Sequence, residues 1–364
     1  MEAKYPLKPE ERVLYALRGL YRQYGYSQFK MGKFEEYDLY VRNKDFLVSD
    51  GIITFTDTDG RLMALKPDVT LSIIKNARVA PGCVQKLYYN ENVYRVSGST
   101  HCFKEIMQTG LECIGDVGLY NLCEVISLAA RSLGLIDERY VLDLSHMGVV
   151  SALVDALELD ADARQAVLKC IGEKNADGVR KLCPDRNLDG ILALIAAHGP
   201  ARDVLPALAP YCVGGAARVA LDELRSVTDA LAAEGLTRVG VDFSIVNDMN
   251  YYNGIVFMGY IDGIPASVLS GGQYDKLMQR MGKSARAIGF AIYMDLLERL
   301  DGGEHPYDVD TLLIYKDGDD AAALARTVRE LTSQGKRVTA QKAVPEKLRY
   351  REIVQFDNRQ GGLN

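Results

Sequence analysis

The sequence predicts an α+β fold in which helices flank a mostly antiparallel sheet. Three observations support this fold class. Two β-rich runs flank an Asp-Thr-Asp-Gly turn within residues 51–70, as in a hairpin. Residues 148–235 are rich in Ala, Leu and Asp at helical spacing, which indicates an inserted helical module. A strand, a helix and a strand follow one another in residues 308–342. We therefore expect a core at 1–147 and 236–303, a helical insertion at 148–235, and a small α/β segment at 304–364.

The N-terminal part alternates helices with strands. A first helix is expected over residues 8–24, where Pro9 and Glu10 suit a first turn and apolar residues follow at helical spacing. A strand that leads into a second helix is expected over residues 25–41. Gly60 supplies the positive φ that the hairpin turn favours. Strands are then expected at 80–96, 103–115 and 139–148, with a helix at 117–134.

Strand character returns after the insertion. The sequence predicts strands at 238–246 and 254–261, and a third from residue 266 onward. The stretch "GFAIYMDLLERL" (289–300) predicts a helix that closes the core. Residues 301–306, "DGGEHP", are interpreted as a linker that precedes the tail.

The composition argues against several classes of protein. The 364 residues are 48% apolar and 25% charged, and their net charge is −6, which is typical of a soluble globular protein and unfavourable for nucleic-acid binding. The first residues form no apolar or Arg-rich leader, and no apolar run reaches the ~18 residues of a membrane span. The seven cysteines and four histidines are scattered without a CxxC pair, so we expect neither metal nor disulfides. We expect a cytoplasmic protein that binds neither nucleic acid nor membrane.

Four short stretches carry residues suited to chemistry, and each has an ordinary structural explanation when taken alone. In "LKPDVT" (65–70), Asp68 and Thr70 are two residues apart and would share one side of an extended chain. A strand end followed by a turn explains the same residues.

The second stretch, residues 88–112, combines a lone cation with polar strand positions. Arg95 precedes a small polar loop, and Gln108 and Glu112 lie on one face of an expected strand. Buried polar groups at these positions would need partners, whereas a solvated edge strand would not bury them.

The third and fourth stretches are rich in tyrosine and glycine. In "NDMNYYNGIVF" (247–257), Tyr251 and Tyr252 each need a hydroxyl partner if they are buried. In "SGGQYDKL" (270–277), two glycines allow close backbone approach and Tyr274 follows. A core tyrosine pair and a glycine turn are the plain alternatives.

Taken in order, the four stretches resemble histidyl-tRNA synthetase, a class II aminoacyl-tRNA synthetase. The resemblance covers about residues 8–300 and continues weakly into the tail. Its clearest parts are "TDTDGRLMALKPDVT", "VYR…MQTGLECIG", "NYYNGIVF" and "SGGQYD…AIGFA". It implies a class II synthetase-like antiparallel sheet, and it implies that 304–364 is a truncated anticodon-binding-like segment.

The resemblance implies a pocket for histidine. In the family, an acid, a threonine and a strand glutamine hold the amino group, and a glutamate and tyrosines recognise the imidazole. A carboxylate and hydroxyls suit an ammonium, and a carboxylate can orient an imidazole N–H. The acid is a glutamate in the family and an aspartate here. The expected histidine-binding residues of this chain are Asp68, Thr70, Arg95, Gln108, Glu112, Tyr251, Tyr252 and Tyr274.

The residues that the family uses on ATP are largely replaced. Asn247 stands where an arginine precedes the tyrosine pair, and "SGSTHC" (97–102) contains no Arg or Lys. Tyr293 and Leu296 stand where the last motif has a small residue and an arginine, and the Glu298–Arg299 pair comes three residues late. Tyr293 would also fill the space of the adenine ring. Because one positioned charge contributes about 3–4 kcal/mol to transition-state stabilisation, we expect no adenylation.

A histidine pocket on a scaffold without synthetase chemistry is similar to the regulatory subunits of ATP phosphoribosyltransferase. This resemblance implies a non-catalytic subunit without a cofactor, for which histidine is the allosteric ligand. Its partner would be the short-form catalytic subunit, which joins ATP to phosphoribosyl pyrophosphate in the first step of histidine biosynthesis. The subunit would activate that enzyme and transmit feedback inhibition by histidine. A homodimer within a hetero-oligomer is expected by analogy with class II cores.

Two other functions stay open at this point. One is a divergent histidyl-tRNA synthetase that uses relocated arginines, with Arg95, Arg280, Arg286 and Arg299 as the nearby candidates. The other is a synthetase paralogue that binds another amino acid or RNA.

Overall fold

A computed structural model describes residues 9–44, 47, 51–96, 102–246, 251–299, 306–357 and 362–363. The chain divides into two compact units, residues 1–300 and residues 301–364, and each is described by itself. The expected linker at 301–306 lies outside the described residues except for Pro306.

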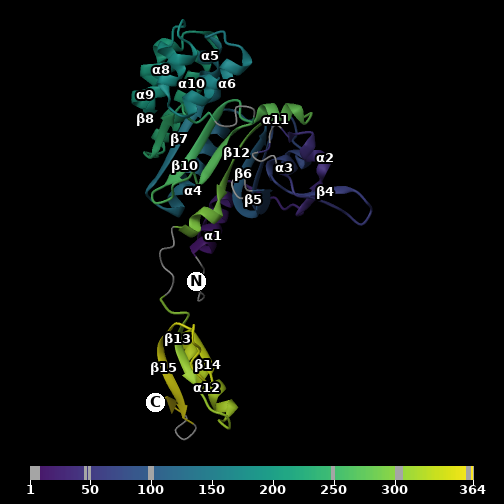
Figure 1. The fold of residues 1–364 in the computed structure, drawn as a ribbon, viewed down its shortest axis with the longest axis vertical. Helices are drawn as coiled ribbons and strands as arrows, with labels where there is room; N and C mark the ends of the chain where they lie inside the picture. Colours follow the sequence, from purple (N-terminus) through teal and green to yellow (C-terminus); the bar gives the residue numbers. More distant parts are fainter. Residues whose placement is uncertain are drawn as a thin grey trace. The chain divides into compact units, whose positions relative to one another are not determined.

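A nine-stranded sheet is the framework of the first unit (Figure 1). Its strand order is β1-β5-β6-β12-β11-β10-β7-β9-β8. The pairs β1–β5 and β7–β9 are parallel, and the other neighbours are antiparallel, as the sequence predicts. The strands are β1 (Ser27–Gln28), β5 (Val84–Val96), β6 (Phe103–Gly115), β7 (Tyr140–His146), β8 (His198–Gly199), β9 (Val239–Asp242), β10 (Ile255–Ile261), β11 (Leu269–Gln273) and β12 (Arg286–Tyr293).

Two long helices build the core on one face of this sheet. α1 (Pro9–Gln23) packs against α4 (Leu119–Ile136), and α4 also contacts β7, β10 and β12. By length and composition alone, α4 could cross a membrane. However, more than half of its residues, Leu128 and Leu133 among them, are buried inside the protein. α4 is therefore a core helix.

A smaller sheet of order β2-β4-β3 accompanies the large one. Gly60 has a φ of 80° in the turn between β3 and β4, which confirms the expected hairpin. The side chains of Tyr40, Ala64 and Ile73 share a second buried cluster with the large sheet. The elements are β2 (Phe34–Glu36), α2 (Tyr37–Val41), β3 (Thr54–Thr56), β4 (Leu62–Leu65) and α3 (Thr70–Asn76).

Helices fill the chain between β7 and β9, and they gather at one end of the sheet, beside β8 and β9 (Figure 1). Asp160 and Asn175 each accept a hydrogen bond from a backbone N–H three residues on, which caps two of these helices. The helices are α5 (Met147–Asp155), α6 (Ala161–Gly172), α7 (Ala176–Leu182), α8 (Asp189–Ala196), α9 (Ala201–Leu208), the 3-10 helix η2 (Ala209–Tyr211) and α10 (Gly215–Ala233).

The second unit is a four-stranded sheet of order β14-β13-β15-β16 with one packed helix. β13 pairs in parallel with β14 across α12, which confirms the strand–helix–strand unit expected from the sequence. β15 pairs in parallel with the other edge of β13. The elements are β13 (Val309–Ile314), α12 (Ala321–Ser333), β14 (Val338–Gln341), β15 (Tyr350–Asp357) and β16 (Gly362–Leu363).

One secondary-structure prediction is wrong. Residues 289–300 do not form one helix, because β12 continues to Tyr293 and a 3-10 helix, η3 (Met294–Arg299), follows it. Backbone ladders to β6 and β11 hold β12 on both sides, and Ile288 and Ile292 bury one of its faces. Pairing within the sheet therefore overrides the helical spacing of these side chains.

Replacing Phe257 should destabilise the first unit strongly. Its ring is fully buried and lies 6.3 Å from that of Phe290. We expect Phe257→Ala to lower the free energy of unfolding by about 3–5 kcal/mol in chemical denaturation, because it leaves a cavity in the core. Phe103→Ala is the matched control, since Phe103 is 73% exposed and its loss should change stability by less than about 0.5 kcal/mol. Equal losses in the two variants would contradict this description of the core.

Candidate ligand pocket

The eight residues expected to bind histidine line one cavity. The cavity lies on the sheet face opposite α4, because Glu112 of β6 points away from its neighbours Leu111 and Cys113, which join the helical core. Its volume is ≈ 180 Å³. Drug-sized ligands occupy pockets of about 300–1,000 Å³, so this cavity suits a smaller metabolite.

Glu112 is the polar centre of the cavity. Its side chain is 2% exposed, and its two carboxyl oxygens accept hydrogen bonds from Thr70 Oγ1 (2.8 Å) and from the Tyr274 hydroxyl (2.6 Å). Burial raises the pKa of Glu112 to about 8, although both hydrogen bonds oppose the rise. On the paired strand β12, Gly289 faces Glu112, and a Cβ there would overlap the carboxylate. A glycine is therefore needed beside this acid.

Asp68 and Thr70 line the cavity, but their local structure differs from the expected one. They do not share an extended strand, as expected, because β4 ends at Leu65 and Thr70 opens helix α3. Asp68 Oδ1 instead accepts a hydrogen bond from Leu71 N (2.9 Å), as side chains before a helix do. Burial raises the pKa of Asp68, while this hydrogen bond and the charge of Arg95 oppose the rise.

Three tyrosines form an aromatic wall. The rings of Tyr251 and Tyr252 are 4.7 Å apart in an edge-to-face arrangement, and that of Tyr251 lies 5.9 Å from Tyr274. Burial, with the nearby acids, raises the pKa values of Tyr251 and Tyr274 well above the ordinary value, so both hydroxyls stay protonated. At Gly272, a Cβ would come within 2.8 Å of the Tyr252 ring. Gly272 therefore makes room for the wall.

Gln108 and Arg95 complete the expected set. Gln108 is 4% exposed because β6 lies between β5 and β12, so the alternative of a solvated edge strand is wrong. Arg95 lies at the end of β5, and its Nε donates to Pro67 O (3.0 Å). Within the part of the chain that the structure describes, Arg95 is the only Lys or Arg that lines the cavity.

The structure adds wall residues that the sequence did not assign to the histidine pocket. Gly289, Ala291 and Tyr293 line the cavity at alternate positions of β12, which strand periodicity could have shown once the segment was recognised as a strand. From the sequence, Tyr293 is expected only to fill the space of the adenine ring. The other added residues are Tyr89, Met258, Ser267, Ser270 and Phe290.

Parts of the expected loss of ATP chemistry lie outside the described residues. These are Asn247, residues 97–101 of the polar loop, and the side chains of Glu298 and Arg299. Leu296 is described, and it packs against the main core. Across the described ranges, no group of three or more His, Cys, Asp or Glu side chains is placed to hold a metal ion.

The cavity can recognise a small molecule that carries both charges and an aromatic ring. Asp68 and Glu112 can accept hydrogen bonds from cationic or N–H groups, and Arg95 offers a positive charge. The tyrosine rings offer flat apolar surface together with hydroxyl donors.

The raised pKa of Glu112 predicts a specific pH dependence of stability. The folded protein keeps a proton on Glu112 up to about pH 8, whereas the unfolded chain loses it near the ordinary value of 4.5. The contribution of this group to stability is therefore present below about pH 4.5 and is lost as the pH rises to about 8. Glu112→Gln removes this loss, so the variant should gain stability relative to wild type between pH 5 and 8. Chemical denaturation of both proteins across this pH range is the measurement. A difference in unfolding free energy between Glu112→Gln and wild type that did not change with pH would contradict the raised pKa of Glu112.

Comparisons with known proteins identify the family. A sequence model described as histidyl-tRNA synthetase matches residues 6–297. An ATP phosphoribosyltransferase regulatory subunit from Moorella thermoacetica is 31% identical over 342 residues, which cover 90% of this chain and 85% of that protein.

Solved structures show the same fold. A Bacillus halodurans protein, described as an ATP phosphoribosyltransferase regulatory subunit/histidyl-tRNA synthetase, has a TM-score of 0.78 at 23% identity, over 98% of this chain and 96% of that chain. A chain of an ATP phosphoribosyl transferase (HisG:HisZ) complex from Thermotoga maritima has a TM-score of 0.63 at 21% identity, over 78% of this chain and 97% of that chain. By the match to the family model and by its relatives, this chain belongs to the ATP phosphoribosyltransferase regulatory subunits, which carry a histidyl-tRNA synthetase-like domain.

Proposed function

We propose that this chain is a non-catalytic regulatory subunit of ATP phosphoribosyltransferase that binds L-histidine in the cavity around Glu112. The observation that carries this proposal is the convergence of all eight expected recognition residues on one small cavity, in a chain whose relatives bear that name. The core at 1–147 and 236–303 would hold the ligand.

The ligand would lie with its polar groups against complementary side chains. Asp68 and Gln108, with Thr70, would hold the ammonium of histidine, and Glu112 would orient the imidazole N–H beside the tyrosine wall. Arg95 would face the carboxylate. Each ionic or hydrogen-bonding group of histidine then meets a partner of opposite character, as binding in a buried site requires.

The cavity wall supports recognition without adenylation. Attack of a carboxylate on the α-phosphate of ATP needs fixed cations around the phosphates. Among the described lining residues, Arg95 is the single Lys or Arg, and Tyr293 occupies the wall at the end of β12. By the family resemblance, Tyr293 would stand where a synthetase places adenine.

The partner would be the short-form catalytic subunit of the enzyme. The Thermotoga maritima chain with this fold comes from a structure described as an ATP phosphoribosyl transferase (HisG:HisZ) complex. A homodimer of this chain within a hetero-oligomer in the cytoplasm is the proposed assembly. Histidine would inhibit by binding one assembly state more tightly than another, since only differential affinity shifts an equilibrium.

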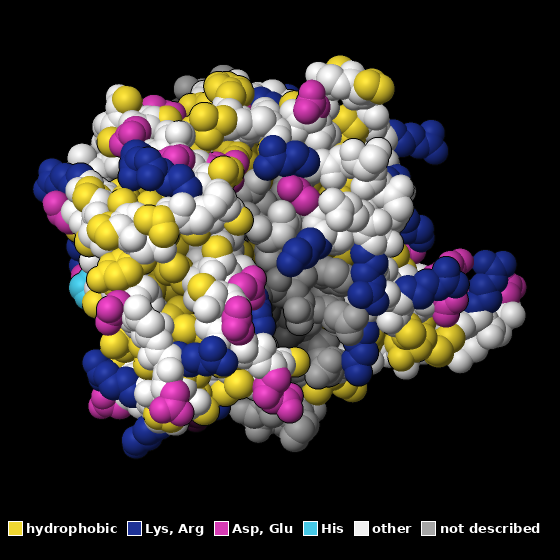
Figure 2. Space-filling model, turned by 90° about the horizontal axis from the view of Figure 1, so that it is seen from above, with side chains coloured by type: hydrophobic (Ala, Val, Ile, Leu, Met, Phe, Trp, Pro, Cys, Tyr) yellow, Lys and Arg dark blue, Asp and Glu magenta, His cyan; other side chains and the backbone are white. Residues whose placement is uncertain are grey.

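A nucleic-acid partner is not part of the proposal. On the face drawn in Figure 2, Lys and Arg side chains are interspersed with acidic, apolar and neutral ones. The whole chain carries a net charge of −6. Binding to a phosphate backbone favours clustered positive charge, which neither observation provides.

Reconstitution tests the proposed function. We expect calorimetry to show histidine binding to the purified chain, and we expect added chain to activate a short-form catalytic subunit and make its reaction sensitive to histidine. ATP–pyrophosphate exchange that depends on histidine would instead establish a divergent synthetase. Failure both to bind histidine and to co-purify with the catalytic subunit would leave the third possibility, a paralogue with another ligand.

Two variants should weaken histidine binding. Glu112→Ala removes the acid at the centre of the cavity, and Tyr252→Phe removes one hydroxyl from its wall. Each should cost about 1–3 kcal/mol of binding free energy in calorimetry, because a buried polar group of the ligand loses its partner. Tyr15→Phe is the control, since Tyr15 is 55% exposed on α1 and does not line the cavity. Unchanged affinity in both pocket variants would remove the basis for the histidine assignment.

A further inference from the structure

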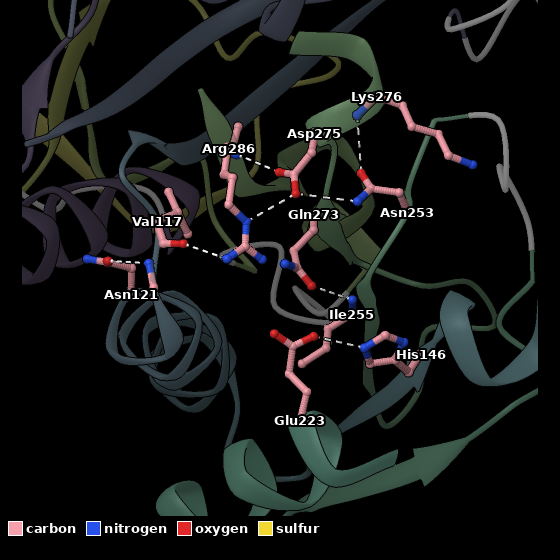
Figure 3. Close-up of polar contacts among 12 residues, drawn as sticks. Val117, Asn121, His146, Glu223, Asn253, Ile255, Gln273, Asp275, Lys276 and Arg286 are labelled. Carbon is pink, nitrogen blue, oxygen red and sulfur yellow. Dashed lines mark hydrogen bonds and ion pairs between the residues drawn. The ribbon is translucent and has the colours of Figure 1, made fainter. Parts of the chain in front are cut away.

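The carboxylate of Asp275 does not line the pocket, but it contacts Arg286 and Asn253 (Figure 3). Asp275 is the first residue of helix α11 (Asp275–Arg280) and directly follows Tyr274. Its Oδ1 accepts a hydrogen bond from Ala287 N (2.9 Å). Its Oδ2 accepts from Arg286 Nε (3.2 Å) and lies 3.4 Å from Asn253 Nδ2. The side chain is only 15% exposed, so these contacts are largely shielded from water.

Arg286 anchors this carboxylate to the framework. It opens β12, and a terminal nitrogen of its guanidinium donates to Val117 O (2.9 Å), just before helix α4 (Figure 3). The guanidinium thus bridges Asp275 and the chain that leads into the core helix. Charge-assisted hydrogen bonds of this kind are about twice as strong as neutral ones, and they fix orientation as well as distance.

Asn253 connects the same carboxylate to the tyrosine pair. It directly follows Tyr252, and its backbone N donates to Gln273 O (3.0 Å). Its Oδ1 accepts from Lys276 N (3.3 Å) in α11. Two residues further on, Ile255 N donates to Gln273 Oε1 (2.6 Å), and the Gln273 side chain is almost fully buried (Figure 3). The segment after the tyrosines is therefore tied to β11 and to α11.

We propose that Asp275 is a positioning residue for the amino-acid pocket, because it holds Tyr274 and the segment after Tyr252 in one fixed arrangement. The inference rests on the proposed function, in which the pocket binds histidine. Tyr274 contacts Glu112 directly, at 2.6 Å, so a small movement of α11 would displace the donor that orients the acid. Recognition groups must hold their positions to about 0.5 Å, and supporting contacts such as those of Asp275 provide this precision.

A purely structural role for Asp275 would have a different signature. The Arg286 partner of Asp275 is 45% exposed, and ion pairs with one solvent-accessible partner contribute little to global stability, typically less than about 1 kcal/mol. Asp275 itself directly follows Tyr274, and one of its partners, Asn253, directly follows Tyr252. Loss of this carboxylate should therefore affect ligand affinity far more than unfolding.

The substitution Asp275→Asn tests the proposal in the full chain. The amide NH₂ group of the new asparagine replaces one of the two carboxylate oxygens. In one orientation it faces the N–H of Ala287, and in the other it faces the side-chain donors of Arg286 and Asn253, so a hydrogen bond is lost either way. The dissociation constant for L-histidine in calorimetry should rise at least about tenfold, which corresponds to about 1.4 kcal/mol, and the loss of unfolding free energy in chemical denaturation should be smaller than this. Asp310→Asn is the matched control, because Asp310 pairs with Arg337 at 3.1 Å in the separate C-terminal unit. The affinity of the Asp310→Asn variant for L-histidine should equal that of wild type.

A double-mutant cycle distinguishes positioning from general damage. If Asp275 acts through Tyr274, the combined loss in Asp275→Asn/Tyr274→Phe should fall short of the product of the single losses by about threefold or more. Asn253→Ala, which keeps the ion pair, gives a second variant should Asp275→Asn fold poorly, and it too should weaken binding.

The outcomes separate this inference from the proposed function. Wild-type chain that does not bind histidine would overturn both. Wild-type chain that binds histidine, with unchanged affinity in Asp275→Asn and in Asn253→Ala, would overturn the positioning role alone. Fully multiplicative losses in the cycle with Tyr274→Phe would also overturn it.

Discussion

The pocket depends on one buried carboxyl group. Glu112 lies within the nine-stranded sheet, where an acid without partners would be strongly destabilising. Its two oxygens are satisfied by Thr70 and Tyr274, which lie 42 and 162 residues away along the chain. The bare backbone of Gly289 leaves the space that the carboxylate occupies. Satisfying this one group therefore brings together the start of α3, the end of β11 and the middle of β12.

The charge balance of the cavity favours recognition of a small molecule over chemistry on ATP. Two acids and a set of protonated tyrosines can accept and donate hydrogen bonds around a small amino acid. Chemistry on ATP would require several fixed cations, and the described lining offers Arg95. The same scaffold thus hosts two kinds of protein, because function resides in the side chains of the site rather than in the fold.

The inserted helices are joined to the nine-stranded sheet by specific contacts. At the end of β7, His146 accepts a hydrogen bond from Gly148 N through Nδ1, and its Nε2 lies 3.0 Å from Glu223 of α10. The next residue, Met147, donates its backbone N–H to Gly254 O (2.9 Å), two residues after Tyr252. The insertion and the tyrosine segment therefore meet at the same corner of the sheet.

The sequence by itself determined the antiparallel sheet, the helical stretch and eight residues that line one cavity, because strand alternation, helical spacing and family motifs are written in neighbouring residues. It did not determine that "GFAIY" is a strand, since only ladders to β6 and β11 decide that. Nor did it explain Asp68, whose place follows from its hydrogen bond to Leu71 N in the first turn of α3 rather than from an extended chain. The packing of Gly289 against Glu112, and the contacts of Asp275 behind the tyrosines, arise only in the tertiary structure. Such contacts join residues distant in sequence, and no local pattern records them.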